Sequence, residues 1–158
     1  MPRVIILDTF PLSSTAKQQP LAGRSLSALD RCHHWIEECI RAGNQVVAPA
    51  ISYYEVVREL ERLGASAQIS RLRTFCHTTP DRYLALTDYD LNLAAKLWAQ
   101  SRNSGIPTAH PESLDGDVLL AAQALGLRIP VQDLVVATTN VAHLSRFVPA
   151  EIWTDIDP

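Results

Sequence analysis

The stretch that decides the fold is Val4-Ile5-Ile6-Leu7-Asp8, in which four apolar residues end at a carboxylate. Three of the four are β-branched, and such residues favour an extended strand. Because the run does not alternate with polar residues, it predicts a strand that is covered on both faces, as in a parallel sheet between helices. Asp8 is then expected at the carboxyl end of a buried strand.

The rest of the chain alternates short apolar runs with amphipathic stretches. Further strands are predicted at 45–50, 84–86, 134–137 and within a closing extended segment, 148–156. Helices are predicted at 26–42, 52–63, 65–76, from Asp88 or Asp90 onward, and at 117–125. The stretch 11–20 reads as a loop or short helix, and 101–114 as a long polar loop. This alternation indicates an α/β layered domain with a mainly parallel sheet.

Two helix starts are predicted from local spacing. Ser52 stands where an N-cap would, and Glu55 follows three residues later, which is the spacing of a capping box. Asp115 is expected to cap the late helix, with Asp117 at the start of its apolar face. Gly43 is expected to stop the helix that ends near Ala42.

Length and composition set limits on the class of protein. A chain of 158 residues is expected to form one domain, 1–158, with one core. A net charge of −3 argues against nucleic-acid binding through bulk positive charge. Three cysteines are an odd number, which is unlike a disulfide framework. No apolar run is long enough to be a signal-peptide core or a membrane span. We therefore expect a soluble, cytoplasmic protein that makes no membrane contact.

Acidic and amide side chains gather at one predicted edge of the sheet. Asp8, Glu55, Asp115, Asp117 and Asn140 all fall near strand ends or helix starts on one side. Each has a local explanation as a turn or cap residue, but a carboxylate that ends a buried strand needs a partner. Ligand chemistry collects at the carboxyl ends of strands in such sheets, so the set predicts one functional site.

The chemistry of these side chains favours a hard cation. A cluster of carboxylates is unstable unless protons or a cation neutralise it. Oxygen ligands without Cys or His at metal-binding spacing favour Mg²⁺ or Mn²⁺ over zinc. The nearest alternative, formed by Cys32, His33, His34 and Cys39, lacks the spacing of a zinc site. The sequence therefore predicts a site for phosphoryl chemistry.

Four segments carry a resemblance to a known family. They are VIILDTF around Asp8, APAISYYEVVREL around Glu55, LDGDVLLAAQALGL around Asp117, and VVATTNVAHLSRF around Asn140. In order and spacing the chain resembles the PIN-domain nucleases, including the VapC-like toxins of toxin–antitoxin pairs. The likeness spans essentially the whole chain.

The resemblance implies a three-layer α/β/α sandwich and metal-dependent hydrolysis of RNA that leaves a 3′-hydroxyl and a 5′-phosphate. Carried over by position, Asp8, Glu55 and Asp117 would bind Mg²⁺ or Mn²⁺ and perform catalysis, with Asp115 as a weaker metal ligand. Thr9 would order the site. Asn140 stands where many relatives have a fourth acid and would contact the phosphate. An antitoxin and a second copy of the chain are the protein partners that the resemblance implies.

Several alternatives stay open at this point. Because Asn140 removes one acid, the chain would alternatively be a catalytically weak or inactive PIN-fold binding protein. A nuclease directed at DNA would use the same acids. Asp133 is a further acid, but it precedes its strand and so belongs to the opposite edge of the sheet. Four arginines on the adjoining helices would guide RNA or simply be solvated, namely Arg58, Arg62, Arg71 and Arg73.

Overall fold

The run that begins at Val4 forms the middle strand of the sheet. In the computed structural model, which describes residues 2–20, 23–105 and 111–158, the described strands follow the order β3-β2-β1-β4-β5 and every neighbouring pair is parallel. Their bounds are β1 Val4–Leu7, β2 Gln45–Pro49, β3 Tyr83–Leu84, β4 Leu134–Thr138 and β5 Ala150–Ile152. All four side chains of β1 are buried, so the prediction of a strand covered on both faces is confirmed.

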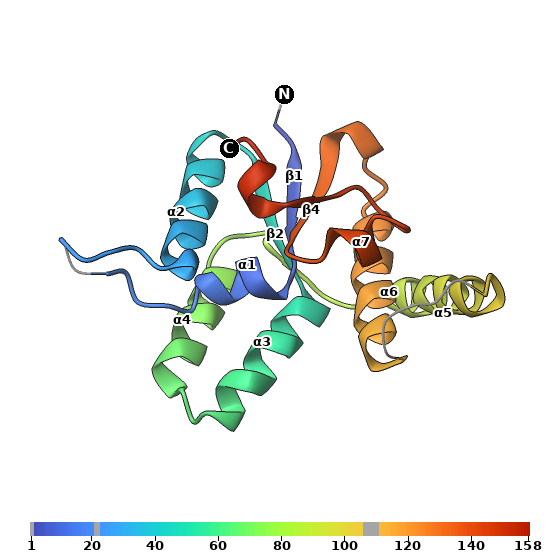
Figure 1. The fold of residues 1–158 in the computed structure, drawn as a ribbon, viewed down its shortest axis with the longest axis horizontal. Helices are drawn as coiled ribbons and strands as arrows, with labels where there is room; N and C mark the ends of the chain where they lie inside the picture. Colours follow the sequence, from blue (N-terminus) through green and yellow to red (C-terminus); the bar gives the residue numbers. More distant parts are fainter. Residues whose placement is uncertain (1, 21–22, 106–110) are drawn as a thin grey trace.

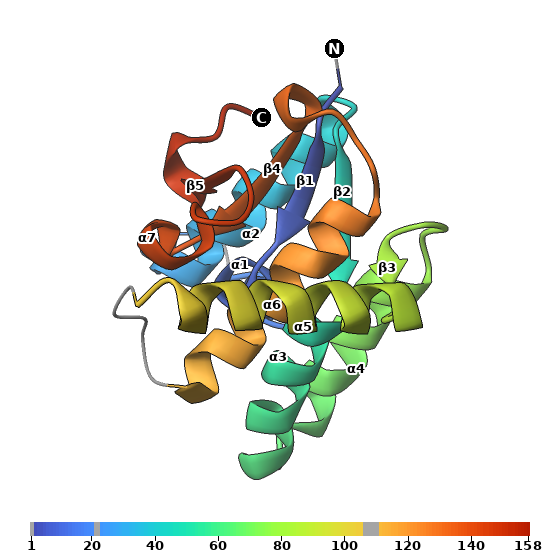
Figure 2. The ribbon, with the colours of Figure 1, turned by 90° about the vertical axis from the view of Figure 1, so that its right-hand side faces the viewer.

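Helices cover both faces of this sheet (Figures 1 and 2). Ile5 and Leu7 of β1 pack in one cluster with residues of the first four helices, and Val4 and Ile6 pack in another with α6 and α7. Figure 2 shows α5 and α6 in front of the sheet and α2 behind it. The helices are α1 Thr9–Ser14, α2 Ala28–Arg41, α3 Ala50–Arg62, α4 Ser66–His77, α5 Asp88–Asn103, α6 Pro111–Gly126 and α7 Val141–Leu144. The three-layer α/β/α architecture is thereby confirmed.

The start of α3 differs from its prediction. The helix begins at Ala50, directly after Pro49 of β2, and Pro49 as the N-cap residue makes no side-chain capping bond. Ser52 therefore lies inside the first turn, and the capping box that its spacing with Glu55 suggested is wrong. Instead, the first-turn N–H of Ile51 donates to Oε1 of Gln123 on α6 at 3.1 Å. Glu55 is left free to serve elsewhere.

The start of α6 also differs from its prediction. The helix begins at Pro111, six residues before Asp117, so Asp115 is an interior helical residue and its predicted capping role is wrong. The expected loop 101–114 is shorter at both ends, because α5 runs on to Asn103 and α6 starts at 111. The part at 106–110 lies outside the described residues.

Smaller differences concern three element ends. α5 is capped by Thr87, with Asp90 completing a capping box, and not by Asp88 or Asp90. The strand expected at 84–86 is Tyr83–Leu84. The closing segment is extended only over Ala150–Ile152, after which 3₁₀ turn η2, Trp153–Asp155, packs Trp153 against Trp35 of α2. A second 3₁₀ turn, η1, Val131–Asp133, leads into β4.

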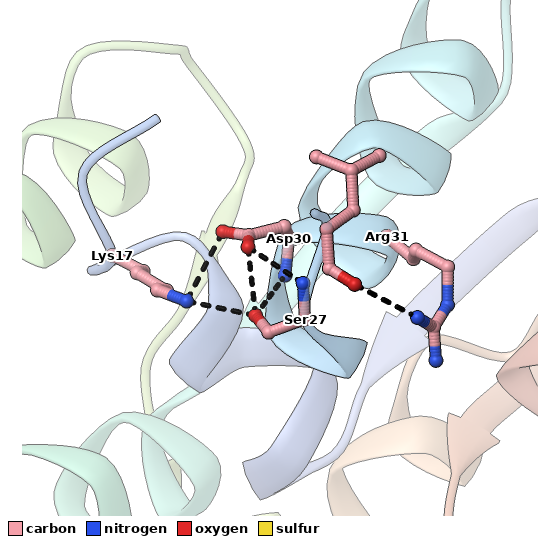
Figure 3. A network of polar contacts seen from close by, with 5 residues as sticks. Lys17, Ser27, Asp30 and Arg31 are labelled. Carbon is pink, nitrogen blue, oxygen red and sulfur yellow. Dashed lines mark hydrogen bonds and ion pairs between the residues drawn. The ribbon is translucent and has the colours of Figure 1, made fainter. Parts of the chain in front are cut away.

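A polar network fixes the start of α2 (Figure 3). Ser27 caps the helix and exchanges hydrogen bonds with Asp30, and Lys17 Nζ reaches Ser27 Oγ at 2.7 Å and Asp30 Oδ1 at 3.2 Å. The segment that follows α1 is thus tied to α2. At the far end Gly43 takes a φ of +91°, a conformation that favours glycine, which confirms the predicted stop.

Among the described helices, none combines the length and the apolar character that crossing a membrane would require.

Candidate metal centre

One cavity lies at the carboxyl ends of the central strands. Its volume is about 570 Å³, and its lining includes five side chains that the sequence singled out, namely Asp8, Thr9, Glu55, Asp117 and Asn140. They come from the end of β1, from the helices α1, α3 and α6, and from the turn after β4. Asp115 is exposed on α6 and does not line the cavity. The topology therefore brings together residues that are more than 130 positions apart.

Asp8 is the most firmly held of the acids. It caps α1, and its Oδ1 accepts a hydrogen bond of 2.7 Å from the backbone N–H of Thr9. Its Oδ2 accepts a second one, also 2.7 Å, from Thr138 Oγ1. Thr138 is fully buried at the end of β4, and its hydroxyl in turn accepts from the backbone N–H of Asn140. Both oxygens of Asp8 are thus fixed in direction, as charge-assisted hydrogen bonds require.

Glu55 reaches the same cavity from the second turn of α3. Thr9 Oγ1 donates a hydrogen bond of 2.6 Å to Glu55 Oε2, so Thr9 links Asp8 and Glu55 through its backbone and its hydroxyl. The other oxygen, Oε1, lies above Gly116 of α6, where a Cβ atom would stand only 2.6 Å from it. Glu55 therefore occupies space that exists because residue 116 has no side chain.

Asp117 shows that the acids act on one another electrostatically. Its pKa is raised to about 6, first by burial and then by the negative charges of Asp8 and Glu55. His143 of α7 opposes this shift, and its Nδ1 lies 3.6 Å from Asp117 Oδ2. A buried carboxyl beside two others prefers its neutral form unless a positive charge is near. The arrangement at Asp117 is therefore one that a cation would stabilise.

Asn140 lines the cavity and also contacts α7. Its Nδ2 lies 3.2 Å from Nδ1 of His143, and its backbone precedes the first residue of that helix. Its amide can contact a molecule in the cavity through hydrogen bonds but adds no negative charge. The turn after β4 thus supplies an amide, and α7 supplies an imidazole, beside the three acids.

The donor atoms of the three acids are oxygens, which are the ligands that a hard divalent cation prefers. The three acids offer carboxylate oxygens, and Glu55 Oε1 has no hydrogen-bond partner among the described residues. Across 2–20, 23–105 and 111–158, no three His, Cys, Asp or Glu side chains already stand in positions that would hold a metal ion. The carboxylates would therefore have to close around an ion for it to bind.

The four arginines that were considered for RNA contacts have different surroundings. Arg58 lines the cavity, where its guanidinium lies over the ring of Tyr54. The others have partners elsewhere: Arg62 pairs with Glu59, Arg71 Nε donates to the backbone carbonyl of Ala16 at 2.7 Å, and Arg73 Nε lies 3.4 Å from the Tyr53 hydroxyl. Asp133 precedes β4, at the opposite end of that strand from the cavity.

Sequence reasoning missed three polar residues around the site. Thr138 and His143 contact Asp8 and Asp117, and the buried side chain of Gln123 joins Ile51 N and Leu84 O. Gln123 carried a weak signal, since it is a polar residue within the apolar run 118–125. For Thr138 and His143, proximity to Asn140 was the available signal.

Comparison with known proteins shows similarity in structure. No protein-family model and no curated protein matches the sequence. The structure of VapBC-1 from nontypeable Haemophilus influenzae includes a similar chain, with a TM-score of 0.61, 18% identity, and coverage of 96% of this chain and 99% of the other. For FitAcB from Neisseria gonorrhoeae the TM-score is 0.64 at 20% identity, with coverage of 96% of this chain and 99% of the other. For VapBC2 from Rickettsia felis, bound to a DNA fragment from its promoter, the TM-score is 0.66 at 14% identity, with coverage of 95% of this chain and 98% of the other. Over nearly its full length, this chain therefore has the fold of chains found in the VapBC and FitAB structures.

Proposed function

We propose that this chain is an Mg²⁺- or Mn²⁺-dependent endoribonuclease that hydrolyses RNA phosphodiester bonds in the cavity described above. The observation that carries the proposal is the convergence of Asp8, Glu55 and Asp117, in which the first two raise the pKa of the third. A site that gathers negative charge in this way is suited to a divalent cation. The VapBC and FitAB fold adds support at the level of the architecture.

Asp8 and Asp117 would hold the metal, and Glu55 would bind it or orient the attacking water. When bound, the metal lowers the pKa of a water molecule and offsets the charge that builds up on the phosphate. Thr9 and Thr138 keep both oxygens of Asp8 directed. The Asn140 amide would donate to a phosphate oxygen, and Arg58 at the cavity wall would attract the RNA backbone.

The protein partner that this proposal implies is an antitoxin that would keep the nuclease inactive, as in a type II toxin–antitoxin pair. VapBC and FitAB structures share the fold, which supports this part of the proposal. A homodimer is also proposed, on the resemblance alone. Co-purification of the chain with the product of an adjacent gene would test the first, and light scattering the second.

The test of the activity is cleavage of single-stranded RNA by the purified protein with Mg²⁺ or Mn²⁺. We expect Asp8→Asn and Asp117→Asn each to reduce the rate by at least about 100-fold, because each removes a ligand that supports several kcal/mol of charge stabilisation. Asp133→Asn is the matched control, since Asp133 lies at the other end of β4, and it should cleave normally. Full activity in either site variant would reject the proposed site. A DNA strand of the same sequence, run in parallel, tests the choice of RNA.

A second candidate function is a PIN-fold binding protein without catalysis. It is favoured by Asn140, which adds no negative charge. It is also favoured by the positions of the carboxylates, because among the described residues no three His, Cys, Asp or Glu side chains are placed to hold a metal ion. Calorimetric titration with Mn²⁺ separates the two candidates. Binding at micromolar to millimolar Mn²⁺ supports the nuclease, whereas the absence of any heat at millimolar Mn²⁺ supports the binding protein.

A further inference from the structure

Asp117 differs from the other two acids in how it is held. Asp8 accepts hydrogen bonds at both oxygens and Glu55 at one, from Thr9 and Thr138. For Asp117, the described residues supply one polar partner, which is His143 Nδ1 at 3.6 Å from Oδ2. Without that contact, the carboxylate of Asp117 would have no polar partner among residues 2–20, 23–105 and 111–158.

His143 is held in place from two sides. The next residue, Leu144, is fully buried and anchors α7 in the core that also contains β1. On the other side, the backbone N–H of Asn140 donates to Thr138 Oγ1 at 2.9 Å, and Thr138 donates to Asp8. Segment 138–143 therefore connects Asp8 to Asp117 through a continuous series of contacts that passes through Asn140 and His143.

The position of the proton on the imidazole ring decides what this series can do. If Nε2 carries the proton, Nδ1 accepts from the Asn140 amide and turns a lone pair toward Asp117 Oδ2, which repels the ionised carboxylate. If Nδ1 carries it, the ring donates toward Asp117, and the Asn140 amide, turned over, presents its oxygen to the same N–H. Of these two neutral forms, only the second donates toward an ionised Asp117, as the doubly protonated ring also does.

We infer that His143 is a positioning residue which, through an Nδ1–H donor, directs the carboxylate of Asp117 toward the metal site, a role that rests on the proposed function. The end of β4 and α7 thereby orient Asp8 and Asp117, through Thr138 and His143. Carboxylates that bind metal ions are commonly held by hydrogen bonds from neighbouring groups, and the loss of such a partner costs about 10–100-fold in metal affinity.

The direct test needs neither metal nor activity. A two-bond ¹H–¹⁵N spectrum of the full chain, recorded where the ring is neutral, reports which nitrogen of His143 is protonated. We expect Nδ1–H in the wild type and a shift toward Nε2–H in Asp117→Ala. His34, an exposed histidine whose Nε2 lies 3.2 Å from Glu38 on α2, is the internal control and should not change. An Nε2–H tautomer at His143 in the wild type would overturn the inference.

Two isosteric variants then test the link to the metal. Asparagine can place a donor near the position of Nδ1, whereas glutamine places one near Nε2. We expect His143→Gln to weaken Mn²⁺ binding in calorimetry by about tenfold or more, and His143→Asn to restore most of it. Equal losses in both variants, or none, would contradict the role of Nδ1. If the wild type cleaves no RNA while the spectrum shows Nδ1–H, the proposed nuclease fails and the contact of His143 with Asp117 stands.

Discussion

Two glycines on α6 each make room for a carboxylate. A Cβ at Gly116 would stand 2.6 Å from Glu55 Oε1, and one at Gly126 would stand 2.6 Å from Asp90 Oδ1. Glu55 lines the cavity, whereas Asp90 belongs to the capping box of α5. The same small change at the two positions therefore affects the candidate site in one case and a helix end in the other.

We predict that Gly116→Ala lowers the rate of RNA cleavage by about tenfold or more. The new Cβ would displace the Glu55 carboxylate, and a small displacement of a catalytic group lowers the rate strongly. The fold should persist, since the clash is with the end of a flexible side chain and alanine favours the helix by about 1 kcal/mol. The measurement is the cleavage rate at saturating Mn²⁺, next to a thermal unfolding curve.

Gly126→Ala is the matched control for this prediction. It should change the midpoint of thermal unfolding through Asp90 but leave the cleavage rate unchanged. Normal cleavage by Gly116→Ala would mean that the position of Glu55 over Gly116 has no functional importance.

At the scale of elements, one buried polar side chain of α6 connects it to α3 and β3. Gln123 is 1% exposed; its Oε1 accepts from the backbone N–H of Ile51 at 3.1 Å and its Nε2 donates to the carbonyl of Leu84 at 2.8 Å. Ile51 lies in the first turn of α3, which carries Glu55 one turn later. Gln123 therefore connects the start of α3 with the end of β3.

We predict that Gln123→Leu lowers the free energy of unfolding by about 2–4 kcal/mol, because it leaves a buried N–H and a partly buried carbonyl without partners. Urea denaturation measures this loss. The control is Gln100→Leu, an exposed position on α5, where the change should stay within about 0.5 kcal/mol. A similarly small loss at Gln123 would show that water or a shifted backbone replaces both hydrogen bonds.

The elements also show what could be predicted from the sequence. The buried strand at Val4 and the run at 134–137 were predictable, because an uninterrupted apolar stretch fits few other structures. The start of α3 was not, because the spacing of Ser52 and Glu55 satisfies a capping rule, whereas the first-turn N–H of Ile51 is bound by Gln123 of α6. Local spacing describes neighbours along a chain and says nothing about a partner on another element.

The candidate site was predictable to the same extent. Asp8 and Asn140 were identified because they end strands, and the cavity does contain both. The contacts of Thr138 with Asp8 and of His143 with Asp117 depend on segments that only the folded sheet brings together. No periodicity marks such pairs. The roles of Asp8, Glu55 and Asp117 in metal binding remain predictions.

At the scale of the whole molecule, Asp117 makes global stability depend on pH. Its pKa rises from 3.8 to about 6 on folding, so between these values the folded state binds more protons than the unfolded state. The favourable contribution of Asp117 to the stability of the metal-free protein is therefore complete below about pH 4. It is lost as the pH rises through 6.

We predict that Asp117→Asn stabilises the metal-free protein at pH 7.5 by about 1 kcal/mol, a value reduced for solvent screening, and leaves it unchanged at pH 4. Calorimetric unfolding at the two pH values measures this. Mn²⁺ should raise the unfolding midpoint of the wild type at pH 7.5 and much less at pH 5, because protons compete for the same oxygens. Destabilisation of the metal-free protein by Asp117→Asn at pH 7.5 would contradict the assigned cause.

The pairing of β1 with β4 has a consequence for the protein during its synthesis. Asp8 is synthesised 130 residues before Thr138, and a ribosome adds about 5–20 residues each second. Until β4 emerges, the growing chain contains Asp8 without Thr138, whose hydroxyl donates to it, and without His143. The site is thus incomplete in the nascent chain until β4 has emerged and paired with β1.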